Sequence, residues 1–134
     1  MCVRSLDLLL GGVLWAGMAG VAAHAMLPAS QRAELSNPTP ATEASREAGR
    51  TTYERRCQFC HAPDGTGGRR LEEGAPASDL TDETWDFGET DGEIFSVIKL
   101  GVPPDYVMAA WEDRLTDEDI WHLVNYIRAF ASER

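Results

Sequence analysis

The pentapeptide Cys57-Gln58-Phe59-Cys60-His61 constrains this chain more than any other stretch of its sequence. Two thiols three positions apart can each add to one vinyl group of a single porphyrin, and the imidazole that follows then lies beneath the iron. The spacing therefore predicts one haem c, attached covalently through Cys57 and Cys60, with His61 as an axial ligand of the iron.

Two other chemistries use a Cys-x-x-Cys pair. A zinc site needs a second pair of soft ligands, and a thioredoxin-like dithiol needs a strand-helix-strand surrounding. After Cys60 the sequence contains no further cysteine and only two histidines, His61 and His122. The sequence therefore favours haem attachment, with a metal site or a disulfide as the alternatives.

Residues 1–25 have the pattern of a secretory signal peptide. Arg4 precedes an apolar run of 16 residues, 8–23, and Ala23-His24-Ala25 is a small-x-small cleavage pattern. The run is shorter than the about 20 residues that usually span a bilayer. We therefore predict export to a bacterial periplasm, with a membrane-anchored chain that faces the periplasm as the alternative.

Cleavage after Ala25 would remove Cys2 and leave Cys57 and Cys60 as the only cysteines among 109 residues. In an oxidising compartment such a pair closes as a disulfide unless another reaction consumes both thiols. Covalent haem attachment is such a reaction. Export and haem attachment therefore support each other.

The remaining 109 residues suffice for one domain but are few for a large apolar core, to which a buried porphyrin would add. Residues 62–134 carry 17 acidic and six basic side chains. This charge makes nucleic acid and anionic membrane surfaces poor partners and favours a basic protein surface. An acidic surface that serves only solvation is the alternative.

Residues 26–41 contain three prolines and no apolar periodicity, which predicts a flexible lead-in. Beyond it, Gly49, Tyr53 and Cys57 fall on one helical face, which predicts a first helix that ends at the haem motif. A glycine inside a helix costs about 1 kcal/mol relative to alanine. We therefore expect another helix to cross closely at Gly49, with a tolerated surface glycine as the alternative.

Residues 62–88 contain five glycines and two prolines and are predicted to be mostly loop. Thr90 begins a capping box that predicts a short helix ending at Gly101. Thr116 begins the last helix, after an extended loop over 102–115. The apolar stripe of this last helix consists of Ile120, Leu123, Val124, Ile127 and Phe130.

The second axial ligand decides whether a c-type haem carries electrons or binds small molecules. Met108 is the only methionine after the haem motif and lies in the proline-containing loop before Trp111. His122 falls opposite the apolar stripe of the last helix and is expected to face solvent. We therefore predict that His61 and Met108 ligate the iron, with an ordinary core methionine as the alternative.

These motifs together resemble those of class I cytochromes c, especially small exported bacterial ones, over residues 45–130. The resemblance rests on Gly49-x-x-x-Tyr53-x-x-x-Cys57 before the haem motif and on four further stretches: 79–82, 91–95, Gly101 with Met108 and Trp111, and 123–127. It implies an all-α domain over residues 42–134. Three to four helices would surround one haem c, and the N-terminal and C-terminal helices would cross.

The resemblance also implies a function. The chain would be a soluble periplasmic electron carrier, monomeric when free and not an enzyme, between a dehydrogenase or other donor and a terminal oxidase or other acceptor. One alternative is a haem subunit of a membrane or dehydrogenase complex. Another is a haem enzyme or gas sensor with an open axial site.

Two family features match this sequence only in part. Many relatives have a proline directly after the ligand methionine, where this chain has Ala109. The family also uses a proline carbonyl to hold the proximal imidazole, and Pro76 is the nearest match. Trp85 and Arg70 are candidates for contact with a haem propionate, with a core tryptophan and a surface arginine as the alternatives.

Overall fold

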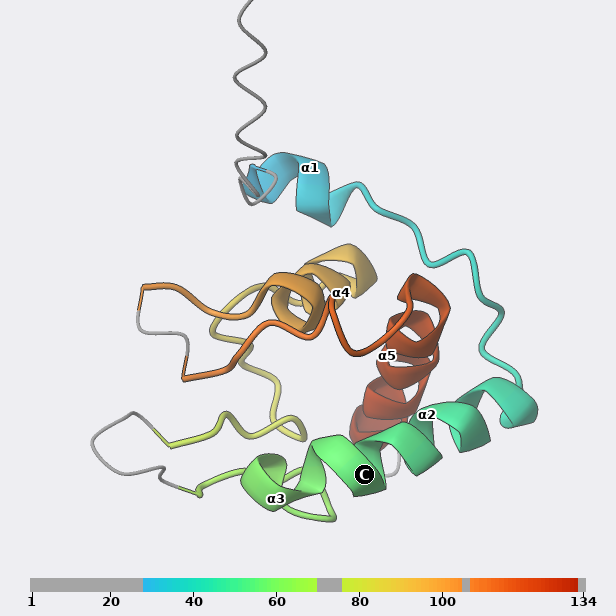
Figure 1. Cartoon of the computed structure of the whole chain (residues 1–134), viewed down its shortest axis with the longest axis vertical. Coiled ribbons are helices and arrows are strands. Elements are labelled where there is room, and N and C mark those ends of the chain that lie inside the picture. Colours follow the sequence, from blue (N-terminus) through green and yellow to red (C-terminus); the bar gives the residue numbers. More distant parts are fainter. Residues whose placement is uncertain (1–27, 70–75, 105–106, 133–134) are drawn as a thin grey trace, which may run out of the picture.

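The computed structural model describes residues 28–69, 76–104 and 107–132 (Figure 1). Its helices are α1 (Ala29–Ala33), α2 (Glu43–Arg56), α3 (Gln58–His61), α4 (Asp91–Leu100) and α5 (Asp117–Ser132). These residues contain no strand, which confirms the all-α prediction. The three predicted helices correspond to α2, α4 and α5, and α1 and α3 are short additional helices.

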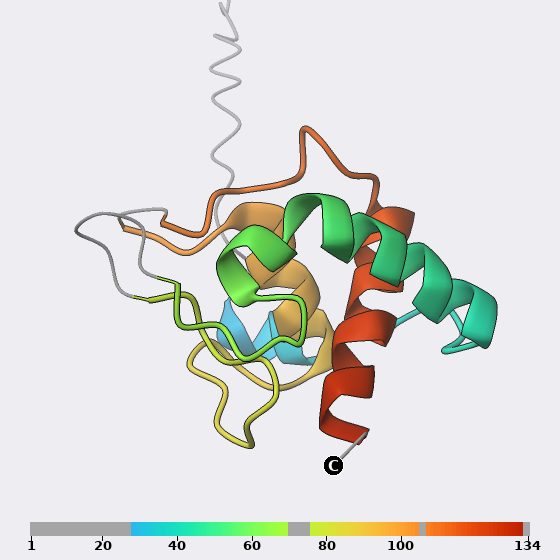
Figure 2. The same ribbon diagram turned by 90° about the horizontal axis from the view of Figure 1, so that it is seen from below.

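Helix α2 crosses α5 at Gly49 (Figure 2). A β-carbon built on Gly49 would lie 2.1 Å from the carbonyl oxygen of His122 and 2.8 Å from the β-carbon of Tyr126. Only a residue without a side chain allows two helix backbones to approach so closely. The predicted close crossing at Gly49 is therefore confirmed.

The apolar core lies along α5, on which both α2 and α4 pack. Its fully buried large side chains are Tyr53 of α2 and Ile120, Leu123 and Val124 of α5. Helix α4 adds Phe95, whose ring stacks on Trp121 of α5 with 4.1 Å between ring centroids. The apolar stripe predicted for the last helix thus faces the core.

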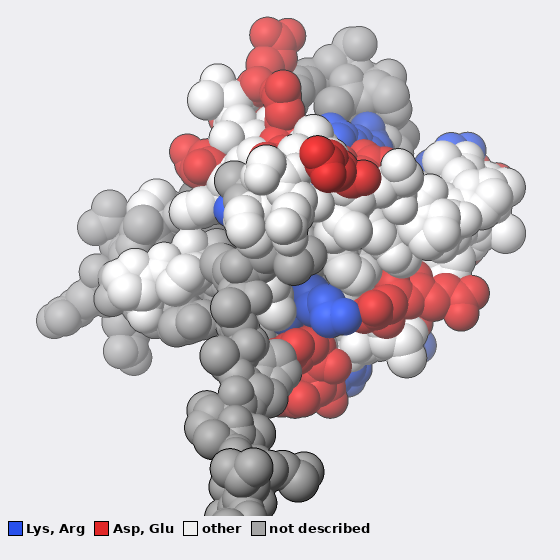
Figure 3. All heavy atoms as spheres, turned by 90° about the horizontal axis from the view of Figure 1, so that it is seen from above, with Lys and Arg blue, Asp and Glu red and all other residues white. Residues whose placement is uncertain are grey.

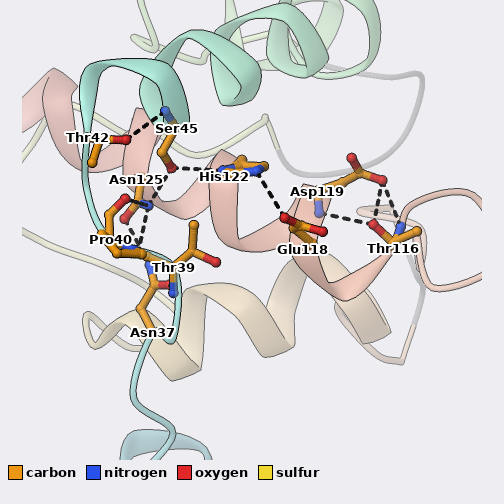
Figure 4. Close-up of polar contacts among 10 residues, drawn as sticks. All are labelled: Asn37, Thr39, Pro40, Thr42, Ser45, Thr116, Glu118, Asp119, His122 and Asn125. Atoms are coloured by element: carbon orange, nitrogen blue, oxygen red, sulfur yellow. Dashed lines mark hydrogen bonds and ion pairs between the residues drawn. The ribbon is translucent and has the colours of Figure 1, made fainter.

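Side-chain caps begin both later helices. The Thr90 hydroxyl accepts from the Glu93 amide, and the Glu93 carboxylate accepts from the Thr90 amide, as in the predicted capping box. Thr116 and Asp119 exchange the same pair of hydrogen bonds at the start of α5 (Figure 4). The starts of α4 and α5 therefore follow from local sequence.

Residues 28–41, the described part of the predicted flexible lead-in, contact α4 and α5, while the flexibility of the lead-in stays a prediction. A β-carbon on Gly92 of α4 would lie 2.1 Å from the Arg32 carbonyl oxygen and 2.5 Å from the Leu35 β-carbon, so this segment packs directly on α4. The Asn37 side chain donates to Oδ1 of Asn125 at 2.9 Å (Figure 4). Contacts with α4 and α5, rather than an apolar period, give the segment its position.

His122 also differs from its prediction, because its side chain is only 21% exposed. Its Nδ1 lies 2.8 Å from the Ser45 hydroxyl oxygen, which also accepts from Nδ2 of Asn125 (Figure 4). Its Nε2 lies 3.9 Å from a carboxylate oxygen of Glu118. The close crossing of α2 covers this face of α5, so His122 lies between helices rather than in solvent.

The predicted signal peptide, residues 1–25, lies outside the described residues. Among the helices described, none combines the length and apolar character that crossing a bilayer requires. Export and cleavage of the chain stay predictions.

Replacing Gly49 by alanine tests the helix crossing. The added methyl group would overlap the His122 carbonyl, so Gly49→Ala should lower the free energy of unfolding by about 1–3 kcal/mol despite alanine's higher helix propensity. Denaturant unfolding followed by circular dichroism measures the change. The control Ala48→Val adds bulk at an exposed neighbouring position and should cost less than about 0.7 kcal/mol. A more stable Gly49→Ala variant would contradict the close crossing.

Candidate haem site

The haem motif folds as one helical turn at the end of α2. Cys57 is the C-cap of α2, and its carbonyl oxygen accepts from the backbone amides of Cys60 and His61, each at 3.0 Å. Residues three apart in a helix lie on the same side of it. Cys57, Cys60 and His61 accordingly line one cavity.

This cavity has a volume of about 370 Å³, within the range of cofactor sites in proteins. Met108 also lines it, so the structure brings all four sequence-predicted site residues together. Apolar side chains from several segments form much of the wall, among them Leu80, Trp85, Ile94, Ile98, Trp111 and Leu123. Such a wall suits a flat apolar ring whose polar groups lie at its edge.

The imidazole of His61 is held in one orientation. Its Nδ1 lies 3.1 Å from the Ser78 carbonyl oxygen, and a carbonyl only accepts, so Nδ1 carries the proton and donates. The lone pair is then on Nε2, the nitrogen available to a metal. Burial lowers the pKa of His61, against the opposing effect of the Ser78 hydrogen bond, so the ring is neutral at neutral pH.

The identity of this acceptor corrects one expectation. The carbonyl group that holds His61 belongs to Ser78, not to Pro76. Gly67 lets the chain at Ser78 come this close, because a β-carbon on Gly67 would lie 2.4 Å from the Ser78 carbonyl oxygen. Every residue has a carbonyl group, so no side-chain pattern identifies Ser78 in the sequence.

The thiol of Cys57 is partly buried. Burial, and to a smaller extent the nearby Cys60, raises the pKa of Cys57 to about 12. At neutral pH the sulfur is therefore a thiol rather than the thiolate that binds zinc or attacks disulfides. Within the described part of the chain, no group of three or more His, Cys, Asp or Glu side chains is placed to hold a metal ion.

The loop after α4 folds back on the end of that helix. The Val102 amide donates to the Met108 carbonyl at 2.9 Å, and a β-carbon on Gly101 would lie 2.6 Å from the same carbonyl oxygen. The Trp111 amide donates to the carbonyls of Ile98 and Lys99. These contacts fix the backbone at the Met108 carbonyl and at Trp111, and the partly buried side chain of Met108 packs against the core.

Of the other sequence candidates, Trp85 lines the cavity and lies beneath the guanidinium of Arg128, whose central carbon is 5.9 Å from its ring centroid. Arg128 also donates to the Asp91 carboxylate at 2.8 Å, which ties α5 to the start of α4. Contact of Trp85 with a propionate stays a prediction. Arg70 lies outside the described residues.

The residues present fit haem c. Two thiols, one neutral imidazole with Nε2 available and one thioether line the same largely apolar cavity. This donor set and this spacing are those of a covalently attached haem with a nitrogen and a sulfur ligand. The roles of Cys57, Cys60, His61 and Met108 follow from that fit and stay predictions.

Comparison with known families gives one match over most of the domain. The sequence profile of the family described as cytochrome C oxidase, cbb3-type, subunit III matches residues 44–127. The matched region begins in α2, includes the haem motif and Met108, and ends in α5.

Among solved structures, a chain of the reducing HAO-like protein complex of Kuenenia stuttgartiensis is similar, with a TM-score of 0.60 and 22% sequence identity. The similarity covers 73% of this chain and 48% of that one, so this chain spans about half the length of its structural neighbour. At this identity the likeness shows a shared fold.

Two glycines with similar backbone conformation test the support of His61. Gly67 and Gly68 have φ of 65° and 80°, but only Gly67 lies against Ser78, whereas nothing lies within 4 Å of a β-carbon on Gly68. Alanine at either position should cost about 1–2 kcal/mol in stability through the positive φ. Gly67→Ala should in addition push the Ser78 carbonyl away, make the imidazole less basic and so raise the reduction potential.

Potentiometry of the two haem-loaded variants against the parent chain measures this difference. The reduction potential of Gly68→Ala should stay at the parent value. Equal potentials for both variants would contradict a role of the Ser78 carbonyl in holding His61.

Proposed function

Because this chain belongs to the cytochrome c family described as cytochrome C oxidase, cbb3-type, subunit III, we propose that it is a monohaem electron carrier of the bacterial periplasm. Family membership itself implies haem c and electron transfer. The proposal adds attachment through Cys57 and Cys60 and axial ligation by His61 and Met108. The observation that carries it is the placement of all four side chains around one apolar cavity.

Haem c, when attached, supplies a one-electron couple between ferric and ferrous iron. The protein's contribution is to keep both ligands in place. The Ser78 carbonyl orients His61, and the contacts of Val102 and Gly101 hold the backbone of Met108. Ligands held in this way move little between oxidation states, as an electron carrier requires.

We propose that the chain carries out no bond chemistry on a substrate. Among the described residues that line the cavity, His61 is the only histidine, and the carboxylates are those of Asp79 and Asp86. Asp79 accepts from the amide and hydroxyl of Thr81, and Asp86 accepts from the Ser78 hydroxyl. These carboxylates are engaged in holding the loop, which makes them poor candidates for a general acid or base.

The charge around the cavity favours a basic redox partner. Residues 79–93 contain seven acidic and no basic side chains, and this stretch supplies Asp79 and Asp86 to the cavity wall. On the face shown in Figure 3, acidic side chains cover more of the surface than basic ones. Complementary charge mainly speeds the encounter of two proteins and weakens as ionic strength rises.

A second candidate function is a haem subunit of a larger complex. The family description names an oxidase subunit, and the structural neighbour belongs to a protein complex.

Size-exclusion chromatography of the native periplasmic and membrane fractions, followed by haem staining, distinguishes the free carrier from the complex subunit. Elution near the 14.7 kDa of the chain, or slightly below it after signal cleavage, supports the free carrier, whereas elution only at several times this mass supports the subunit.

Replacing Met108 by alanine tests the axial ligand. The haem-loaded parent chain should show the weak long-wavelength absorption band of sulfur bound to ferric iron, and Met108→Ala should lose this band. The variant should also have a lower reduction potential, because a neutral thioether favours ferrous iron. Absorption spectroscopy and potentiometry measure both changes.

Val107→Ala is the matched control, because Val107 is the adjacent, 46% exposed residue of the same cavity wall. This variant should keep the band. A parent chain that lacks the band and binds carbon monoxide readily would contradict the carrier and support the haem enzyme or gas sensor.

A further inference from the structure

The backbone directly after His61 is strained. Ala62 has φ 62° and ψ 160°, in a region that is essentially restricted to glycine. Such a conformation costs about 1–3 kcal/mol and persists only where neighbouring groups fix it. The backbone directly after His61 therefore keeps a conformation that is unfavourable for alanine.

The hydroxyl of Tyr53 is one of the groups that hold it. It donates to the Ala62 carbonyl oxygen at 2.7 Å and lies 3.3 Å from the His61 carbonyl oxygen. The amides of Gly65 and Gly67 donate to the same two carbonyls, at 3.3 Å and 2.9 Å respectively. Tyr53 is the only side chain among these donors, and it comes from α2, before the haem motif.

The same turn also positions the group that orients the imidazole. Gly67 lies against the Ser78 carbonyl, and the Leu80 amide donates to the Gly65 carbonyl at 2.7 Å. The segment that carries Ser78 is thus fastened to the turn that Tyr53 holds. Movement of this turn would shift both the backbone of His61 and the acceptor of its Nδ1 proton.

Tyr53 itself is fixed by the crossing of α2 and α5. Its side chain is fully buried, and its ring meets those of Tyr126 and Phe130 edge to face at 5.4 Å and 5.3 Å between centroids. A β-carbon on Gly65 would lie 2.8 Å from the Phe130 ring, so the turn packs on the same aromatic group. Burial raises the pKa of Tyr53, and the hydroxyl stays a donor at physiological pH.

We propose that Tyr53 is a positioning residue for the proximal ligand: its hydroxyl holds the strained turn at Ala62 and thereby the orientation of the His61 imidazole. This inference rests on the proposed function, because it requires His61 to be a haem ligand. Packing of the aromatic ring and the hydrogen bond of the hydroxyl are separable contributions, since phenylalanine retains the first and removes the second.

Hydrogen exchange of the His61 Nδ1 proton in the haem-loaded protein, measured by NMR, tests the proposal. This proton is protected as long as it donates to the Ser78 carbonyl. Tyr53→Phe should speed its exchange about five- to tenfold, the equivalent of one ordinary hydrogen bond. Tyr126→Phe is the matched control, because it removes the hydroxyl of a second tyrosine of the same aromatic group, on α5 rather than α2, and it should leave the rate unchanged.

Equal exchange rates in Tyr53→Phe and the parent, or in Tyr53→Phe and Tyr126→Phe, would overturn the proposal. Failure of the proposed function looks different, because the parent chain itself would then show no iron-shifted Nδ1 resonance from His61.

The backbone strain at Ala62 is tested separately with the variant Ala62→Gly. This variant should raise the denaturation midpoint, and a lowered midpoint would overturn the assignment of strain to Ala62.

Discussion

The contact between Gly49 and the backbone of His122 is the constraint on which the rest of the structure depends. It brings α2 against α5 closely enough to bury Tyr53 among aromatic side chains of α5. Because α2 runs directly into α3, the same contact sets where Cys57, Cys60 and His61 meet the core. A larger residue at Gly49 would therefore displace the haem motif as well as one helix.

From this crossing the site is built mainly by backbone groups. Carbonyls of Ser78, His61 and Ala62 accept the hydrogen bonds that fix the imidazole and its turn, and Gly67 supplies the space for the approach of the Ser78 carbonyl. Burial keeps His61 neutral, and the apolar wall limits water around it. The side chains with predicted chemistry are few, and most of their surroundings serve to hold them still.

Features carried by side-chain patterns could be predicted from the sequence, and features created by tertiary contact could not. The haem motif, the capping box at Thr90 and the close approach at Gly49 each depend on residue type at fixed spacing. The position of segment 28–41 depends on contacts with Gly92 and Asn125 on distant helices, and the shielding of His122 depends on the crossing itself. No side-chain pattern in the sequence indicates that the carbonyl of Ser78, rather than that of Pro76, accepts from His61.

The central claim is that one haem with two protein ligands cycles by single electrons in this cavity. An equilibrium redox titration of the purified haem-loaded protein, followed by absorbance, tests it most directly. The account predicts one reversible transition whose potential changes by about 59 mV for each tenfold change in the ratio of oxidised to reduced protein. Protein without covalent haem, or with haem that does not titrate in a single one-electron step, would contradict it.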